Sequence, residues 1–345
     1  MNSINEHEHK KENIKNSETA VDYEQNSNLF FKTSRARAQY QEDTSQRKRG
    51  DFDMKFGVGH AYWGNTGACD IEKYKRVAKK LADFGFTMFE VTADHIYHMS
   101  EKELAELDAV AREYGLTLST NSGPAKEYDL SSPDEAVRKN GLDYFTQIVR
   151  NMAAIHSPVL AGAIYSFWPS DFAYTDKEAA WEHSIPMLRE LGNRAEAYGI
   201  DCALEVLNRN ETYILTDCAE AIEYCNQIGK KNVNILLDTY HMNIEEDDMC
   251  GAIRKAGDML GHVHVGENNR KLPGMNNSLD WAGIGQALRD IHYDKGVVME
   301  PFLFRGGDVG YSCRVWRDLS NGATQEQLDE YLKTSLKFLK EKFEA

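Results

Sequence analysis

Short apolar runs alternate with longer amphipathic stretches from residue 54 to the C-terminus. There are eight of these runs, at residues 55–60, 88–93, 116–121, 158–165, 202–207, 233–238, 262–266 and 297–302. Most are nearly continuous in apolar residues, a pattern typical of strands buried on both faces of a parallel sheet. The alternation therefore predicts strands that are each followed by a helix.

The stretches between the runs carry signals for the beginnings of helices. Residues 100–115 begin with Ser100 and Glu103, which have the spacing of a capping box. A later helix is expected to begin at Ser132, with Glu135 completing a second capping box. Strand–helix units with right-handed crossovers close most simply into a (β/α)8 TIM barrel, an α/β fold. The alternative is a doubly wound open sheet, but no Gly-x-Gly-x-x-Gly pattern follows the first run.

Residues 1–53 differ in character from the rest of the chain. They are rich in Asn, Glu and Lys and contain few large apolar residues. Such a segment buries too little apolar surface to offset the entropy lost on folding. We therefore expect a disordered N-terminal extension over residues 1–53 and a single barrel domain over residues 54–345.

Composition narrows the range of partners. The formal net charge is −15, which argues against a nucleic-acid-binding surface and against an anionic membrane surface. The six cysteines include no Cys-x-x-Cys pair and are expected to be reduced. No apolar run reaches the roughly 18 residues that a membrane span requires. We expect a cytoplasmic protein without a nucleic-acid or membrane partner.

Residues of the types that bind metal ions stand near the ends of the last four runs. They are Glu205, Asp238, the pair His262 and His264, and Glu300, and the carboxyl ends of the strands are where TIM barrels place their chemistry. Buried carboxylates are rare unless they are paired or bind a metal. The pattern predicts one divalent cation held by one residue from each of the four runs. Three carboxylates and one imidazole, without a thiolate, favour Mn²⁺, Co²⁺ or Mg²⁺ over a structural zinc.

Two of these carboxylates also suggest a reaction. Glu205 and Glu300 belong to the fifth and eighth runs, so they can approach a bound sugar from opposite faces. One can remove a proton from a carbon and the other can return a proton to the opposite face, which is epimerisation. The cation would polarise the neighbouring carbonyl and stabilise an enediolate.

The seventh run holds two histidines, and only one is expected to be a ligand. His262 and His264 stand two apart in a strand, so their side chains point to the same side. His264 lies nearer the carboxyl end of the strand. We expect His264 to bind the cation and His262 to be a deeper, buried support.

Several longer motifs are more specific than any single residue. They are AYW (61–63), DLSSPD (129–134), YSFWP (165–169), LEVLNR (204–209), LLDTYHMNIEE (236–246), GHVHVGENNR (261–270), VVMEPF (297–302) and VWRDLSNGA (315–323). From Met54 onward the chain resembles the ketose 3-epimerases, the D-tagatose and D-psicose (D-allulose) 3-epimerase group, within the xylose-isomerase-like barrels. This resemblance implies C3 epimerisation of free ketohexoses, of the D-fructose/D-psicose or D-tagatose/D-sorbose type. It also implies one Mn²⁺ or Co²⁺ per subunit, with Mg²⁺ possible, and a homodimer or homotetramer.

The resemblance also implies a role for individual residues. The metal ligands would be Glu205, Asp238, His264 and Glu300, with Glu205 and Glu300 as the acid/base pair; the groups that contact the sugar would be Glu211, His241, Arg270 and Trp168. Without the resemblance, these four sugar contacts are read equally well as loop ion pairs, a helix cap and a core residue. The chain departs from the family at Gly59 and His60, where relatives carry an aromatic pair, and this leaves the preferred ketose open.

Three other functions fit part of the pattern. An aldose–ketose sugar isomerase would use the same barrel and cation. A phosphodiester-cleaving barrel would need several metals, more histidines and a basic surface, which the charge of −15 disfavours. A sugar-binding protein without turnover would have no use for the paired acid/base groups.

Overall fold

The computed structural model describes residues 53–63 and 70–345, and the sheet in this part of the chain closes into a barrel. The strands are β1 (Lys55–Gly59), β2 (Met88–Thr92), β3 (Thr117–Ser122), β4 (Val159–Gly162), β5 (Asp201–Val206), β6 (Val233–Asp238), β7 (Leu260–Val265) and β8 (Gly296–Met299). Each strand pairs in parallel with the next, and β8 pairs with β1. The predicted TIM barrel is confirmed, and an open sheet is excluded.

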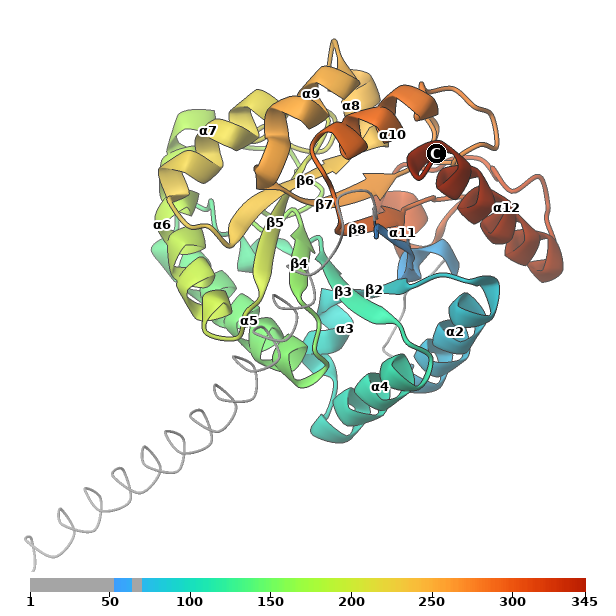
Figure 1. Ribbon diagram of the computed structural model, residues 1–345. Helices are drawn as coiled ribbons and strands as arrows, with labels where there is room; N and C mark the ends of the chain where they lie inside the picture. The colour runs from blue at the N-terminus through green and yellow to red at the C-terminus, as the bar shows by residue number, and fades with distance from the viewer. Residues whose placement is uncertain (1–52, 64–69) are drawn as a thin grey trace, which may run out of the picture. The chain divides into compact units, whose positions relative to one another are not determined.

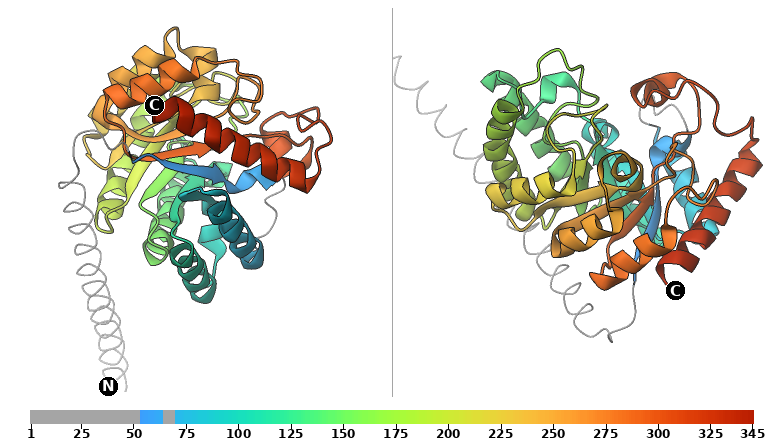
Figure 2. Two further views of the ribbon diagram at one scale, coloured as in Figure 1. Left: turned by 45° about the vertical axis from the view of Figure 1, so that its right-hand side comes forward. Right: turned by 90° about the horizontal axis from the view of Figure 1, so that it is seen from above.

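Helices surround the strands on the outside of the barrel (Figure 1). They are α2 (Ile71–Phe84), α3 (Ala93–His98), α4 (Glu101–Glu113), α5 (Glu135–Ala154), α6 (Lys177–Glu196), α7 (Cys218–Ile228), α8 (Thr239–Glu245), α9 (Met249–Ala256), α10 (Trp281–Asp290), α11 (Gly307–Ser312) and α12 (Gln325–Phe343). Figure 2 shows the same arrangement from two further directions, with the last helix, drawn in dark red, lying along the outside. This cover explains why the strands read as apolar runs, because both faces of the sheet are removed from water.

The strands are almost wholly buried. All six residues of β6 and all six of β7 are buried. Apolar side chains of β4, β5 and β6 form one buried cluster that includes Val159, Ala161, Ala203 and Leu236. The polar residues at the strand ends are thus held on rigid, well-packed elements.

The beginnings of two helices test the local predictions. At α4 the capping box is present: Ser100 Oγ accepts a hydrogen bond from the Glu103 N–H, and the Glu103 carboxylate accepts one from the Ser100 N–H. The predicted start at Ser132 is wrong. Helix α5 begins at Glu135, and Asp134 caps it by accepting the Ala136 N–H at 2.8 Å. An aspartate is as good a cap as a serine, and its charge is favourable at a helix N-terminus.

One prediction falls largely outside the described part of the chain. The expected disordered extension covers residues 1–53, of which the structure describes only Asp53. The division of the chain at residue 54 therefore stays a prediction. Within the described residues, no helix combines the length and the apolar character needed to cross a membrane.

The capping box of α4 gives a prediction for stability. We expect Ser100→Ala to lower the free energy of unfolding by about 1 kcal/mol, because the Glu103 N–H loses its acceptor. Urea unfolding of the two proteins measures the difference. Ser100→Thr keeps the hydroxyl and should stay near the wild-type value; an equal loss in both variants would contradict the role of the cap.

Candidate metal and active site

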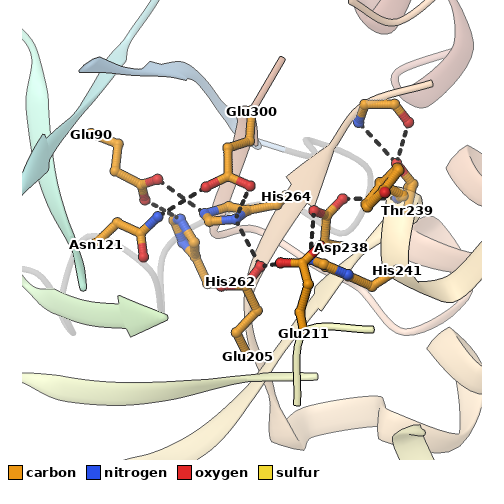
Figure 3. Close-up of polar contacts among 12 residues, drawn as sticks. Glu90, Asn121, Glu205, Glu211, Asp238, Thr239, His241, His262, His264 and Glu300 are labelled. Carbon is orange, nitrogen blue, oxygen red and sulfur yellow. Dashed lines mark hydrogen bonds and ion pairs between the residues drawn. The ribbon is translucent and has the colours of Figure 1, made fainter. Parts of the chain in front are cut away.

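Four neighbouring strands bring the predicted ligands together at one end of the barrel. Glu205 lies in β5, Asp238 ends β6, His264 lies in β7 and Glu300 directly follows β8. One donor atom from each of the four lies within 4.8 Å of those of the others. The register explains this, because Asp238 is the pairing partner of His264 in the adjacent strand. Figure 3 shows the four side chains converging.

His264 stands at the centre of this group. Its Nδ1 atom lies 3.6 Å from Oε1 of Glu205 and 3.6 Å from Oε2 of Glu300. Nε2 lies 3.0 Å from Oε1 of Glu90, whereas Nδ1 has no hydrogen-bond partner among the described residues. A buried ring nitrogen without a partner is unusual unless a further group completes its surroundings. This observation and the oxygen-rich donor set fit a divalent cation.

Burial and mutual repulsion shift the pKa values of the three carboxylates. Burial raises the pKa of Glu205 to about 7, and the charges of Glu300 and Asp238 act in the same direction. Burial, together with Glu300, also raises the pKa of Asp238. Burial alone would raise the pKa of Glu300 as well, but His264 and Arg270 hold it below its usual value. The site therefore has an excess of buried negative charge that needs a positive partner.

Two protein cations supply part of that positive charge. Burial alone would lower the pKa of His264, but the carboxylates of Glu90 and Glu300 hold it well above its usual value. Arg270 donates from Nη1 to Asp238 at 2.8 Å and to Glu300 at 3.0 Å. Its guanidinium also lies over the Tyr240 ring, 3.8 Å from the centroid. Arg270, predicted as a sugar contact, is thus engaged by two of the predicted metal ligands.

The other predicted sugar contacts form a second group beside the first. Trp168 donates from Nε1 to Glu211 at 2.8 Å. His241 is buried, its Nδ1 accepts the Asn208 N–H at 3.1 Å, and burial followed by Arg270 keeps its pKa well below the usual range. The Asn208 amide also donates to Glu211 at 3.1 Å. Asn208, which the sequence analysis did not single out, therefore ties His241 to Glu211.

A pocket runs along these groups. Glu205, Glu211, His241 and Arg270 line its inner part. Asn121, Gly123, Trp168, Glu300 and Phe302 line both this part and an adjoining one. The adjoining part extends past Gly59, Thr92 and Ser312. At Gly59 an added Cβ atom would meet its nearest neighbours only at 3.7 to 4.0 Å, so the missing side chain leaves room there.

One buried carboxylate beside the site was missed by the sequence analysis. Glu90 lies in the middle of β2 and is 1% exposed. Its Oε2 atom accepts from Ser119 Oγ at 3.0 Å and contacts His262 Nε2 at 2.9 Å. The sequence does carry a signal for it, because a glutamate inside an apolar run such as 88–93 is rare without a buried partner. His262 lies on the same side of β7 as His264, as predicted, with the two ring centroids 5.3 Å apart.

Comparison with known proteins places this site in a family. The model of the xylose isomerase-like TIM barrel family matches residues 78–342. The D-psicose 3-epimerase of Ruminiclostridium cellulolyticum is 43% identical over 286 residues, which are 83% of this chain and 96% of that protein. The D-psicose 3-epimerase of Agrobacterium fabrum is 40% identical over 286 residues, 83% of this chain and 98% of that protein. A solved structure of D-psicose 3-epimerase with D-tagatose, from Clostridium cellulolyticum H10, has a TM-score of 0.82 and 43% identity, covering 85% of this chain and 100% of that one.

The chain belongs to the xylose isomerase-like TIM barrel family. Within it, the chain falls beside the D-psicose 3-epimerases, which are carbohydrate epimerases of the isomerase class. The resemblance inferred from the motifs is confirmed.

The contacts of Arg270 give a prediction for the metal-free protein. We expect Arg270→Met to lower the free energy of unfolding by about 3 kcal/mol, because Asp238 and Glu300 lose a buried positive partner. Urea unfolding in the presence of EDTA measures this loss. Arg254→Met is the matched control, since Arg254 pairs with Asp290 at 2.8 Å with side chains 44% and 39% exposed; its loss should stay below about 1 kcal/mol. Equal losses would contradict the role given to Arg270.

Proposed function

We propose that the chain is a metal-dependent 3-epimerase of free ketohexoses. The observation that supports this most is the placement of Glu205 and Glu300, three strands apart in the barrel, on the same pocket and beside the same imidazole. Two carboxylates of this kind suit removal of a proton from one face of a carbon and its return to the other. The epimerase names of the similar proteins support the same reaction.

The cation would be held by Glu205, Asp238, His264 and Glu300. When bound, it would supply Lewis-acid polarisation of the sugar oxygens next to the reacting carbon. The oxygen-rich set favours Mn²⁺, Co²⁺ or Mg²⁺. Binding requires a neutral imidazole, so His264 would release its extra proton as the cation enters.

The chain's own carboxylates would move the proton. One of Glu205 and Glu300 takes the hydrogen from C3 of the ketose as a proton. The electron pair of that C–H bond becomes the C2–C3 double bond, and the carbonyl electrons move to the oxygen on C2. The other carboxyl group then returns a proton to the opposite face of C3, and the C2 carbonyl re-forms. The product is the C3 epimer, with no net change in atoms or electrons.

Four residues would hold the sugar for this step. Glu211, His241 and Arg270 would bind the oxygens at the C1 and C2 end, and Trp168 would form one wall of the pocket. His241 is a neutral, buried imidazole, so it can form a hydrogen bond with a sugar hydroxyl without adding charge to the pocket. We extend the proposal to D-fructose/D-psicose or D-tagatose/D-sorbose as substrates and to a cytoplasmic homodimer or homotetramer.

A panel of free ketoses tests the proposal. The protein with Mn²⁺ or Co²⁺ should convert D-fructose and D-psicose, or D-tagatose and D-sorbose, into their C3 epimers, and EDTA should abolish the conversion. NMR spectra of the products separate this reaction from aldose–ketose isomerisation, which would give an aldose. Failure on every free ketose tested would refute the proposal.

The acid/base pair gives a sharper prediction. In D₂O the wild-type protein should exchange the C3 hydrogen of the sugar with deuterium, because the proton passes through a carboxyl group. Glu205→Gln and Glu300→Gln should each reduce this exchange at least about 100-fold, as expected for a lost general acid or base. Exchange at the wild-type rate in both variants would refute the assignment.

The two histidines give a prediction about metal affinity. His264→Ala should weaken Mn²⁺ binding by about 100-fold or more, since it removes a ligand. His262→Ala should mainly lower the melting temperature, because His262 is buried but stands outside the group of four. Calorimetric titration with Mn²⁺ measures the affinities, and similar losses in both variants would count against the distinction.

A further inference from the structure

Glu90 lines the adjoining part of the pocket together with Asn121 and Glu300, and it touches one of the proposed metal ligands, His264. In the sheet it pairs with Gly59 of β1 and Ser119 of β3, and its side chain is enclosed by the barrel. Figure 3 shows it beside His262 and His264, on the side away from Glu211. The strand therefore fixes this carboxylate at a defined place behind His264.

The two oxygens of Glu90 face different partners. Oε2 accepts the Ser119 hydroxyl at 3.0 Å and lies 2.9 Å from His262 Nε2. Oε1 lies 3.0 Å from His264 Nε2. Oε1 and this nitrogen are both buried, and neither has an aligned hydrogen-bond partner among the described residues. Because they lie 3.0 Å apart, Oε1 of Glu90 and Nε2 of His264 can supply the partner that each of them lacks.

The protonation of an imidazole ring links this contact to the cation site. A neutral imidazole carries one N–H and one lone pair, on different nitrogens. On His264 the Nδ1 atom faces Glu205 and Glu300, while Nε2 faces Glu90. A carboxylate accepts an N–H but cannot donate one. With the N–H on Nε2 toward Glu90, the lone pair of Nδ1 is directed at the group of four donors.

We propose that Glu90 is a positioning residue: its carboxylate holds the N–H of His264 on Nε2 and so presents the Nδ1 lone pair to a divalent cation. This inference rests on the proposed metal dependence of the function. Partners of this kind orient metal-binding histidines in many sites, and their loss typically costs about 10- to 100-fold in metal affinity.

A second cation among Glu90, His262 and His264 is the competing interpretation, since donor atoms of these three also lie within 4.8 Å of one another. It conflicts with the chemistry of His264. One neutral ring has a single lone pair, so His264 cannot serve two cations at once. In addition, Oε2 of Glu90 already receives the hydroxyl of Ser119.

Glu90→Gln is the informative substitution. A glutamine has nearly the same shape, but it presents one acceptor oxygen and one NH₂ donor group. It cannot face both His262 and His264 with an acceptor. Ser119 donates to the oxygen near His262, which favours the amide oxygen at that position and the NH₂ group beside His264. A donor there would favour the tautomer of His264 that carries its N–H on Nδ1, toward the cation site. Ser119→Ala is the matched control, because it removes a hydrogen bond from the other oxygen of the same carboxylate.

The experiment is a Mn²⁺ titration of the EDTA-stripped full chain, followed by electron paramagnetic resonance. The wild type should bind one Mn²⁺ per chain. Glu90→Gln should raise the Kd about 10- to 100-fold while circular dichroism stays unchanged, and Ser119→Ala should raise it less than about threefold. Wild-type affinity in Glu90→Gln, or two Mn²⁺ per wild-type chain, would overturn the inference and leave the proposed function standing. A wild type that binds no Mn²⁺, Co²⁺ or Mg²⁺ would overturn both.

A measurement on the wild type covers the case in which Glu90→Gln does not fold. In the Mg²⁺-loaded protein with ¹⁵N-labelled histidine, the His264 signals, assigned by their loss in His264→Asn, should show the proton on Nε2. A proton on Nδ1 of His264 would overturn the inference.

Discussion

The burial of like charges is the constraint on which the rest of the site depends. Glu205, Asp238 and Glu300 place donor oxygens within a group whose members lie within 4.8 Å of one another, and Asp238 is fully buried. Carboxylates at such distances cannot all stay ionised without positive charge beside them. Arg270 and His264 supply part of that positive charge. A divalent cation would supply more charge at the point where the donor atoms converge.

The barrel makes this concentration of charge sustainable. Each carboxylate lies near or just after the end of a strand whose residues are almost all buried, so the stability of the sheet holds the site in place. Metal sites that are built in this way depend on a further layer of partners that orient the ligands. Asn121, which donates to Glu300 at 3.0 Å, belongs to that layer. Glu90 has the corresponding place behind His264.

Much of the fold and of the candidate site was predictable from the sequence. The eight apolar runs correspond to the eight strands because both faces of the sheet are covered. The four strand-end residues could be predicted because buried charged groups are rare unless they are paired or bind a metal. The start of α5 was placed wrongly, since Ser132 and Asp134 are both good caps and only the backbone decides between them. The contacts of Arg270 were also beyond prediction, because they depend on how a loop folds back over β6 and β8.

The place of Glu90 beside the site was not predicted from the sequence. The rule that singled out Glu205 applies equally to the glutamate inside the run 88–93, but the sequence alone does not show which groups surround it. Its partners come from β3 and β7, and only closure of the barrel brings them to it.

The most direct test of the central claim is the location of the metal itself. An anomalous difference map from crystals grown with Mn²⁺ would show where the ion binds. The account predicts one strong peak per chain, surrounded by Glu205, Asp238, His264 and Glu300. A peak among Glu90, His262 and His264 instead, or no peak at the strand ends, would contradict it.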